Sequence, residues 1–289
     1  MANFWEYGFL QRALIAGLFL SVTAGLLSPF IVLRRLSFSA DGLAHASLGG
    51  LATGMFLSNA GPTPTLGSYA ISFLFTCGVA AAIACFTGGK RVQSDTAIGV
   101  CYVTAFSLGV ILLSFGQHRT GHLEHFFFGS ILAVNPLECA LLAALAASVL
   151  AFVLSRWQWL GQWTFDDELA QASGVAVGRL RYGTILLVAA TVILATRVVG
   201  VLLVTALLII PGAVGSLLST SLRGITVVAL FAAVISVVSG LLASNAADVP
   251  PGPAMVIVLF AFFVVAFAFR QARERRRPRL PQTQEGFIP

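Results

Sequence analysis

Long, uninterrupted apolar runs constrain the fold of this chain more than any other feature. Stretches such as "ILLVAATVILA" and "VLFAFFVVAFAF" lack the alternation of polar and apolar residues that a membrane-spanning β-strand would show. Of the 289 residues, 58% are hydrophobic and only 10% are charged, which is more apolar surface than a soluble domain can bury. A bilayer demands spans of about 20 apolar residues. The sequence therefore predicts an all-α polytopic membrane protein.

The apolar runs divide the chain into eight or nine transmembrane helices. The count depends on residues 182–219, which form either two spans or one span and a broken, re-entrant helix, because Pro211 and Gly212 interrupt the run. Such breaks are tolerated only where the backbone lines protein or a cavity. With two spans in this region, helices are expected near residues 12–33, 40–58, 67–87, 96–116, 136–155, 182–196, 199–219, 223–243 and 252–269.

The basic residues predict the orientation of the spans. The net charge is +6, and arginines gather at the ends of apolar runs and in the tail "RQARERRRPR". Because positive residues mark the cytoplasmic side, the C-terminus and the joins at Arg34, 156–181 and Arg223 are predicted to be cytoplasmic, with the N-terminus outside. Residues 1–270 are expected to form the transmembrane domain, and 271–289 are expected to form a basic, disordered tail that can contact anionic lipid. This distribution accounts for the charge and does not indicate nucleic acid.

One span carries two ionisable residues, Asp41 and His45, four positions apart. On a helix this spacing places both side chains on one face, and ionisable groups inside a span tend to face a partner, a cavity or a transport pathway. A carboxylate oxygen beside an imidazole nitrogen is a suitable half-site for Zn²⁺ or Mn²⁺, and a twofold dimer would bring two such pairs together. On the residues alone, a hydrogen-bonded lock between helices and a proton relay stay open as alternatives.

A second polar group lies in the join "GQHRTGHLEHFFFGS", which the charge rule places outside the membrane. His118, His122 and His125 are spaced four and three apart, with Glu124 among them, so a helix would present all three imidazoles on one face. One interpretation is a vestibule that captures metal. The other is a solvated loop at the membrane interface, anchored by its phenylalanines.

The longest cytoplasmic join contains a short predicted helix, within about residues 164–180. Thr164 is the expected N-cap, Asp167 occupies the capping-box position, and Gly174 is the expected C-cap, which gives a helix of about ten residues. A plain amphipathic connector is the alternative. The sequence has no GxxxxGK[ST] phosphate-binding loop, so this chain is not expected to bind ATP in that way.

Five stretches together resemble one family over roughly residues 10–270. They are "VLRRLSFSADGLAHASLGG", "SDTAIGV", "FFGSILAV", "TFDDELAQASGV" and "GVLLVTALLIIPGAVGSLL". In this order they resemble the permease subunit of metal-ion (zinc, manganese or iron) ABC importers. The resemblance implies a location in the bacterial cytoplasmic membrane and three protein partners. These are a second copy of the chain, a cytoplasmic ABC ATPase dimer and an extracytoplasmic metal-binding protein.

The resemblance also implies roles for particular residues. Asp41 and His45 fall on the family's transport-site ligands, and the segment 164–180 resembles the helix that fits into a cleft of the ATPase. The residues of that segment implied in coupling are Asp166, Asp167, Glu168, Ala170 and Gly174. The permease would not be an enzyme itself: ATP would bind to the partner subunit, and no cofactor would be bound permanently.

The identity of the metal rests on the histidines. Three outward-facing imidazoles favour zinc, whereas manganese sites prefer more oxygen ligands. A manganese or iron importer of the same family, or a proton-coupled secondary metal transporter, is the alternative. Four positions depart from the family pattern. Ser37 and Ser39 stand where bulkier residues are common, and both are interpreted as tolerated. Gly42 follows Asp41 where alanine is usual and is expected to loosen the start of the helix, and Arg197 is expected to mark the outer end of a span.

Overall fold

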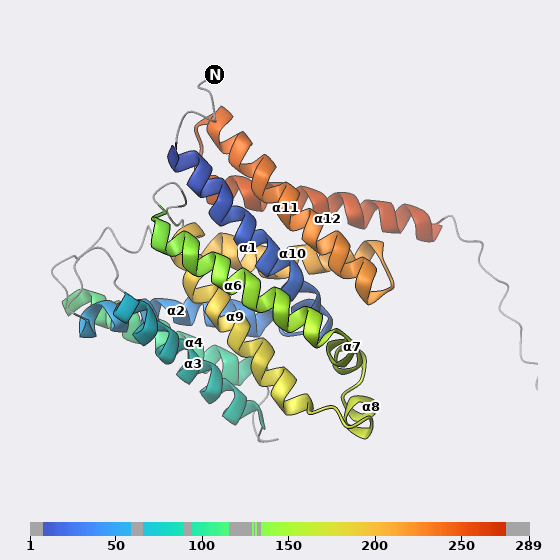
Figure 1. Ribbon diagram of the computed structural model, residues 1–289, viewed down its shortest axis with the longest axis horizontal. Helices are drawn as coiled ribbons and strands as arrows, with labels where there is room; N and C mark the ends of the chain where they lie inside the picture. Colours follow the sequence, from blue (N-terminus) through green and yellow to red (C-terminus); the bar gives the residue numbers. More distant parts are fainter. Residues whose placement is uncertain are drawn as a thin grey trace, which may run out of the picture.

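The structure is a computed structural model that describes residues 8–58, 66–88, 94–115, 129, 131 and 134–275. In this part of the chain there are eleven helices and no strand, which confirms the predicted fold class (Figure 1). The helices are α1 (Gly8–Leu33), α2 (Ser37–Leu57), α3 (Leu66–Gly88), α4 (Ser94–Phe115), α6 (Pro136–Ser155), α7 (Trp157–Phe165), α8 (Asp167–Ala172), α9 (Val177–Val199), α10 (Val201–Leu218), α11 (Leu222–Ala247) and α12 (Pro251–Arg275).

Each of the nine expected spans corresponds to one long helix among the described residues. Eight of these helices are long and apolar enough to cross a membrane. The exception is α2, which is 21 residues long but carries serines, glycines, Asp41 and His45. The region 182–219 contains two helices, α9 and α10, which meet at Gly200 with a φ of 82°. A broken, re-entrant helix is therefore not observed, because α10 continues past Pro211.

Close packing at glycines divides the bundle into two blocks. In the first block, α2 packs on α3 and α4, and a β-carbon at Gly50 would lie 2.8 Å from the Ser72 carbonyl oxygen. In the second, α1 packs on α10 and α11, and a β-carbon at Gly25 would lie 2.9 Å from the Leu230 Cα. Figure 1 shows α2, α3 and α4 grouped apart from α1, α11 and α12.

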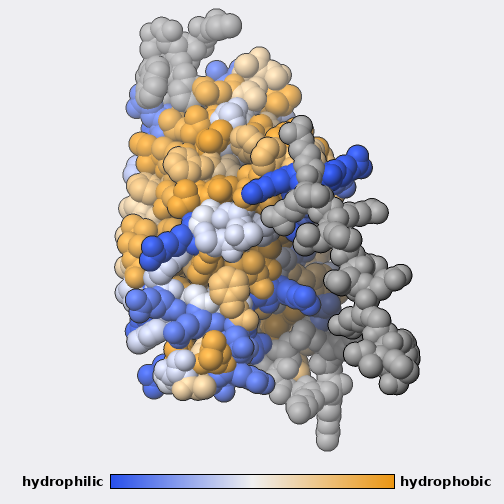
Figure 2. Space-filling model, turned by 90° about the vertical axis from the view of Figure 1, so that its right-hand side faces the viewer, coloured by the Kyte–Doolittle hydropathy of each residue, from blue (hydrophilic) through white to orange (hydrophobic). Residues whose placement is uncertain are grey.

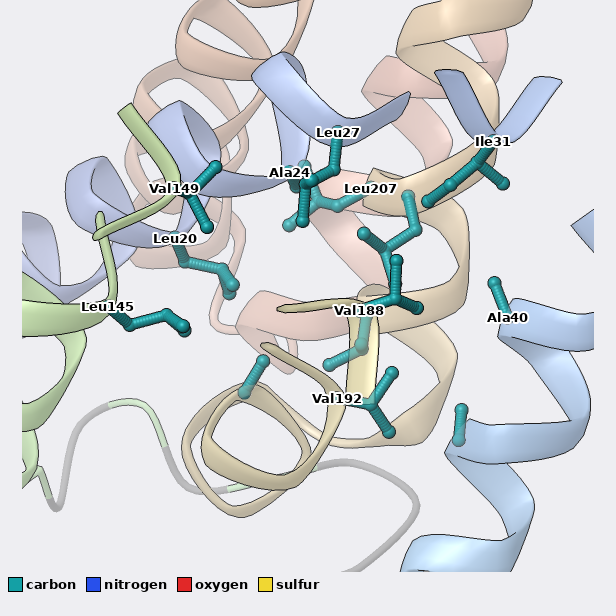
Figure 3. Close-up of a cluster of buried hydrophobic side chains, with 14 of the residues drawn as sticks. Leu20, Ala24, Leu27, Ile31, Ala40, Leu145, Val149, Val188, Val192 and Leu207 are labelled. Atoms are coloured by element: carbon teal, nitrogen blue, oxygen red, sulfur yellow. The ribbon is translucent and has the colours of Figure 1, made fainter. Parts of the chain in front are cut away.

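The core between these blocks is built around α9. Figure 3 shows Val188 and Val192 of α9 directed among side chains from α1, α6 and α10. Val192, Leu207 of α10 and Val149 of α6 have no solvent exposure. The core also includes Ala40 of α2, so α2 is attached to it near its N-terminal end.

Polar side chains collect at the two ends of the bundle. At one end the α1–α2 turn meets α7 and α8 through an ion pair between Arg34 and Asp167, and a β-carbon at Gly161 of α7 would reach Leu222 of α11. The joins predicted to share the cytoplasmic side therefore share one end of the bundle. Figure 2 shows hydrophobic residues over much of one face, with hydrophilic residues gathered toward its lower part.

Candidate functional site

The first turns of α2 bring Asp41 and His45 together as the sequence predicts. Asp41 Oδ1 lies 3.8 Å from His45 Nε2, a spacing that follows from their i,i+4 positions on one helix. A metal held by both atoms at ordinary zinc bond lengths and a tetrahedral angle would need them about 3.4 Å apart, so a small side-chain adjustment suffices. The side chains are 38% and 29% exposed respectively, which leaves one side of the pair open to a further ligand.

Aromatic residues of α4 form a wall beside the pair. The His45 ring lies 5.8 Å from the Tyr102 ring and meets the Phe106 ring edge-on at 6.3 Å. Gly42 permits this approach, since a β-carbon there would lie 2.8 Å from Ile98 Cγ2. α2 is helical from Ser37 onward, and Gly42 lies within it at the contact with α4; its expected effect on the start of the helix stays a prediction.

The pair offers two side chains of types that can bind a metal. Within the described ranges, no group of three or more His, Cys, Asp and Glu side chains is placed to hold a metal ion. The second predicted set, His118, His122, Glu124 and His125, lies outside the described residues, so the histidine vestibule stays a prediction. The arrangement at α2 is thus an open half-site.

The cytoplasmic segment differs in detail from its prediction. Thr164 does not cap a helix: it lies inside α7, and its hydroxyl donates to the Leu160 carbonyl oxygen. The N-cap of α8 is Asp166, which has extended backbone and accepts hydrogen bonds from the backbone N–H groups of Glu168 and Leu169. The helix that follows has 6 residues rather than about ten. Asp166 is the cap because its carboxylate is free to accept from the backbone, whereas the Thr164 hydroxyl is already bonded to the preceding turn of α7.

The end of α8 agrees with the prediction for Gly174. This glycine has a φ of 79°, and the Val175 and Gly174 N–H groups donate to the carbonyl oxygens of Ala170 and Gln171, the pattern of a Schellman motif. Of the residues implied in coupling, Asp166, Glu168 and Gly174 are exposed and Asp167 is half-buried. Ala170 is fully buried, so it supports α8 from the inside and does not lie on its outer surface.

Two apolar side chains that the sequence analysis did not single out project from this segment. Phe165 is 66% exposed at the end of α7, and Leu169 is 61% exposed on α8. Exposed large apolar groups at a polar end of a protein indicate a contact surface. The sequence carried a signal for Leu169. Three acids, Asp166 to Glu168, directly precede it, so this leucine is expected near the protein surface.

At the opposite end, a buried acid that the sequence analysis missed joins three helices. Glu138 of α6 accepts a 2.8 Å hydrogen bond from the Tyr69 hydroxyl of α3, and its carboxylate lies 3.8 Å from Arg197 Nε of α9. Glu138 and Asn135 also form a reciprocal capping box at the start of α6. The pattern Asn-Pro-x-Glu was the available signal. Arg197 is thus paired at a helix end, as expected.

Comparison with known proteins agrees with this architecture. The profile of the ABC 3 transport family matches residues 6–270. The chain belongs to the ABC 3 transport family. Among curated members, a manganese transport system membrane protein of Listeria innocua is 34% identical over 91% of this chain and 91% of its own length. A chelated iron transport system membrane protein of Yersinia pestis is 32% identical, covering 93% and 88% of the two chains.

Other members of the family extend the comparison to zinc and to solved structures. A high-affinity zinc uptake system membrane protein of Haemophilus influenzae is 29% identical, covering 90% of this chain and 97% of that one. The structure of PsaBC from Streptococcus pneumoniae in complex with Fab superposes with a TM-score of 0.81 at 29% identity, over 91% and 92% of the two chains. An inward-facing putative metal-chelate type ABC transporter shares the fold, with a TM-score of 0.67 at 18% identity over 90% and 86% of the chains.

Proposed function

We propose that this chain is the permease subunit of an ATP-driven importer of a divalent transition metal, with zinc as the favoured cargo. The observation that carries the proposal is the Asp41–His45 pair, an open two-ligand site on a helix of an ABC transport family member. The permease is not itself an enzyme. ATP is bound and hydrolysed by a separate subunit, and the metal is cargo that must be released.

The two-ligand site supports a homodimeric permease. One imidazole and one carboxylate from each of two copies give two nitrogen and two oxygen ligands, a set that suits tetrahedral zinc. Manganese, which prefers oxygen ligands, is the second candidate, because members of the family are manganese transport proteins. The exposed side of Asp41 and His45 is where a second copy would contribute.

The α7–α8 segment supports an ATPase partner on the same side as the arginine-rich joins. Its exposed apolar residues, Phe165 and Leu169, sit beside capped acids and form a surface that fits a protein cleft. With that side cytoplasmic, the C-terminus is cytoplasmic and a metal-binding protein delivers cargo at the other face. The proposal locates the protein in the bacterial cytoplasmic membrane.

Reconstitution with the ATPase and the binding protein tests this proposal. We expect ATP-dependent uptake of ⁶⁵Zn²⁺ into vesicles, and loss of uptake in Asp41→Ala and His45→Ala while the ATPase still co-purifies. Manganese uptake under the same conditions measures the preference. Uptake driven by a pH gradient without ATP would instead show a secondary transporter, and full uptake in both variants would show that the pair is a structural lock.

A further inference from the structure

Arg34 joins the turn between α1 and α2 to the α7–α8 segment. Its Nη2 atom lies 2.7 and 2.8 Å from the two carboxylate oxygens of Asp167, and its Nη1 donates to the Trp163 carbonyl oxygen at 3.0 Å. The guanidinium also lies over the buried Trp163 ring, 4.7 Å from its centroid. A planar guanidinium can make all these contacts at once, and the ammonium of a lysine cannot.

The turn that carries Arg34 transmits displacement because it is short and internally bonded. α1 ends at Leu33 and α2 begins at Ser37. Within the turn, Arg35 has a φ of 56°, the Leu36 N–H donates to the Ile31 carbonyl oxygen at 2.8 Å, and the Leu36 carbonyl accepts from Ala40. Because the turn is only three residues long and is tied by backbone hydrogen bonds to both helices, a movement of Arg34 would shift the first turn of α2.

The start of α2 has space into which it can move. A cavity of about 720 Å³ is lined by Ser37, Phe38 and Leu43 of α2 together with Trp163 of α7 and Ile185 of α9. Ile83 of α3 and Ile98 of α4 also line this cavity, and farther along its length α2 is packed through glycines against these two helices. The packing therefore favours movement of α2 with α3 and α4 as one block, relative to α1 and α9.

Asp167, the partner of Arg34, lies on α8, the helix proposed to dock on the ATPase. It is the first residue of α8, directly after the Asp166 cap and two residues before the exposed Leu169. Its carboxylate pairs with Arg34, and the side chain is 47% exposed. A displacement of α8 by a docked protein would therefore pull on Arg34 through this ion pair, which includes the hydrogen bond from Nη2 to Asp167 Oδ2.

We propose that the Arg34–Asp167 pair is the link through which movement of α8 reaches α2 and its metal ligands. The proposal rests on the proposed function, in which α8 docks on the ATPase and Asp41 and His45 bind the metal. Asp41 and His45 lie one and two turns beyond the start of α2, on the same rigid helix. Arg34 and Asp167 are positioning residues, and neither touches the metal or the nucleotide.

Charge reversal in vesicles containing the full complex tests the link. The variants are Arg34→Glu, Asp167→Arg and the double swap, and the measured quantity is zinc transported per ATP hydrolysed. We expect each single variant to keep ATPase assembly and ATP hydrolysis but to lower this ratio by about tenfold, and the double swap to recover most of the loss, as directly coupled pairs do. A residue with only a structural role would lower assembly and leave the ratio unchanged.

Controls separate the possible failures. Arg223→Gln, at an exposed arginine of α11, is expected to leave the ratio unchanged. Should Arg34→Glu fail to assemble, Arg34→Lys is the second variant. Lysine keeps the positive charge but cannot contact the Asp167 carboxylate and the Trp163 carbonyl oxygen in the same way, so the ratio is expected to fall by about threefold. Unchanged ratios in the assembled single variants, or a double swap no better than the singles, would overturn the link. An inactive wild-type complex would instead contradict the proposed function itself.

Discussion

Ser28 Oγ of α1 accepts a 2.7 Å hydrogen bond from the backbone N–H of Gly212 in α10, and it donates to the Ile209 carbonyl oxygen at 3.4 Å. Pro211 lies between these two backbone groups and cannot donate to the preceding turn. The Ser28 hydroxyl thus provides polar partners for the backbone next to the proline, and α10 is helical on both sides of it. Within lipid, such groups need a partner inside the protein.

Gly212→Val is therefore expected to destabilise the permease by about 1–3 kcal/mol, the range for an overpacked contact. Even a β-carbon at this position would lie 2.7 Å from the Ser28 carbonyl carbon, so α1 and α10 would be forced apart. The measurement is the thermal unfolding midpoint in detergent. Gly99→Ala is the matched control, since nothing lies within 4 Å of a β-carbon there, and an equal midpoint for both variants would contradict the contact.

Replacing the imidazole of the α2 pair by a carboxylate is expected to change the cargo preference. In His45→Asp the two ligands are both oxygen donors, which suit manganese better than zinc. We expect zinc uptake to fall by at least about tenfold while manganese uptake falls less, since one nitrogen ligand of a mixed site is lost. Competition between the two ions in vesicles measures this. Thr53→Ala, later on α2, serves as the control, and an unchanged preference in His45→Asp would remove His45 from the ligand set.

Placing a charge on the exposed leucine of α8 is expected to block ATPase assembly without unfolding the permease. Leu169 is 61% exposed, so Leu169→Asp costs little within the chain but puts an unpaired carboxylate into an apolar contact. Co-purification of the ATPase should drop by about tenfold or more. Gln171→Asp adds the same charge at an exposed position of α8 and should retain assembly. Equal assembly for both would place the ATPase contact elsewhere.

The helices themselves were predictable from sequence because each long apolar run must become a helix in lipid. The span predicted at 136–155 matches α6 at both ends, where Asn135 and Pro136 define the start. The Asp41–His45 pair was predictable because helical spacing alone brings i and i+4 together. Both results depend on residues that are neighbours in sequence.

The features missed by the sequence analysis depend on contacts between distant segments. Arg34 and Asp167 are 133 residues apart, and a basic residue at a helix end is fully explained by membrane orientation until its partner is seen. The cap of α8 was predicted at Thr164, and the extension of α7 through Phe165 is what leaves Asp166 as the cap. The contact of Ser28 with the backbone beside Pro211 likewise joins two distant helices.

The buried cluster at the opposite end yields a graded stability prediction. Glu138 is 8% exposed. It accepts hydrogen bonds from the Tyr69 hydroxyl and the Asn135 backbone N–H, and it forms an ion pair with Arg197. Tyr69→Phe removes one hydrogen bond from a carboxylate that keeps its other partners, and is expected to cost about 1 kcal/mol. Glu138→Ala removes the capping-box acceptor and leaves a buried hydroxyl without its partner, so it is expected to cost about 3 kcal/mol.

Thermal unfolding of the purified variants, compared with a Tyr182→Phe control, gives the order. Tyr182 is 64% exposed on α9, so loss of its hydroxyl should not shift the midpoint. A larger shift for Tyr69→Phe than for Glu138→Ala would mean that the tyrosine, and not the acid, organises the cluster. If Glu138 is the centre, Arg197→Met should fall near Glu138→Ala, because it removes the cation that forms an ion pair with the buried carboxylate.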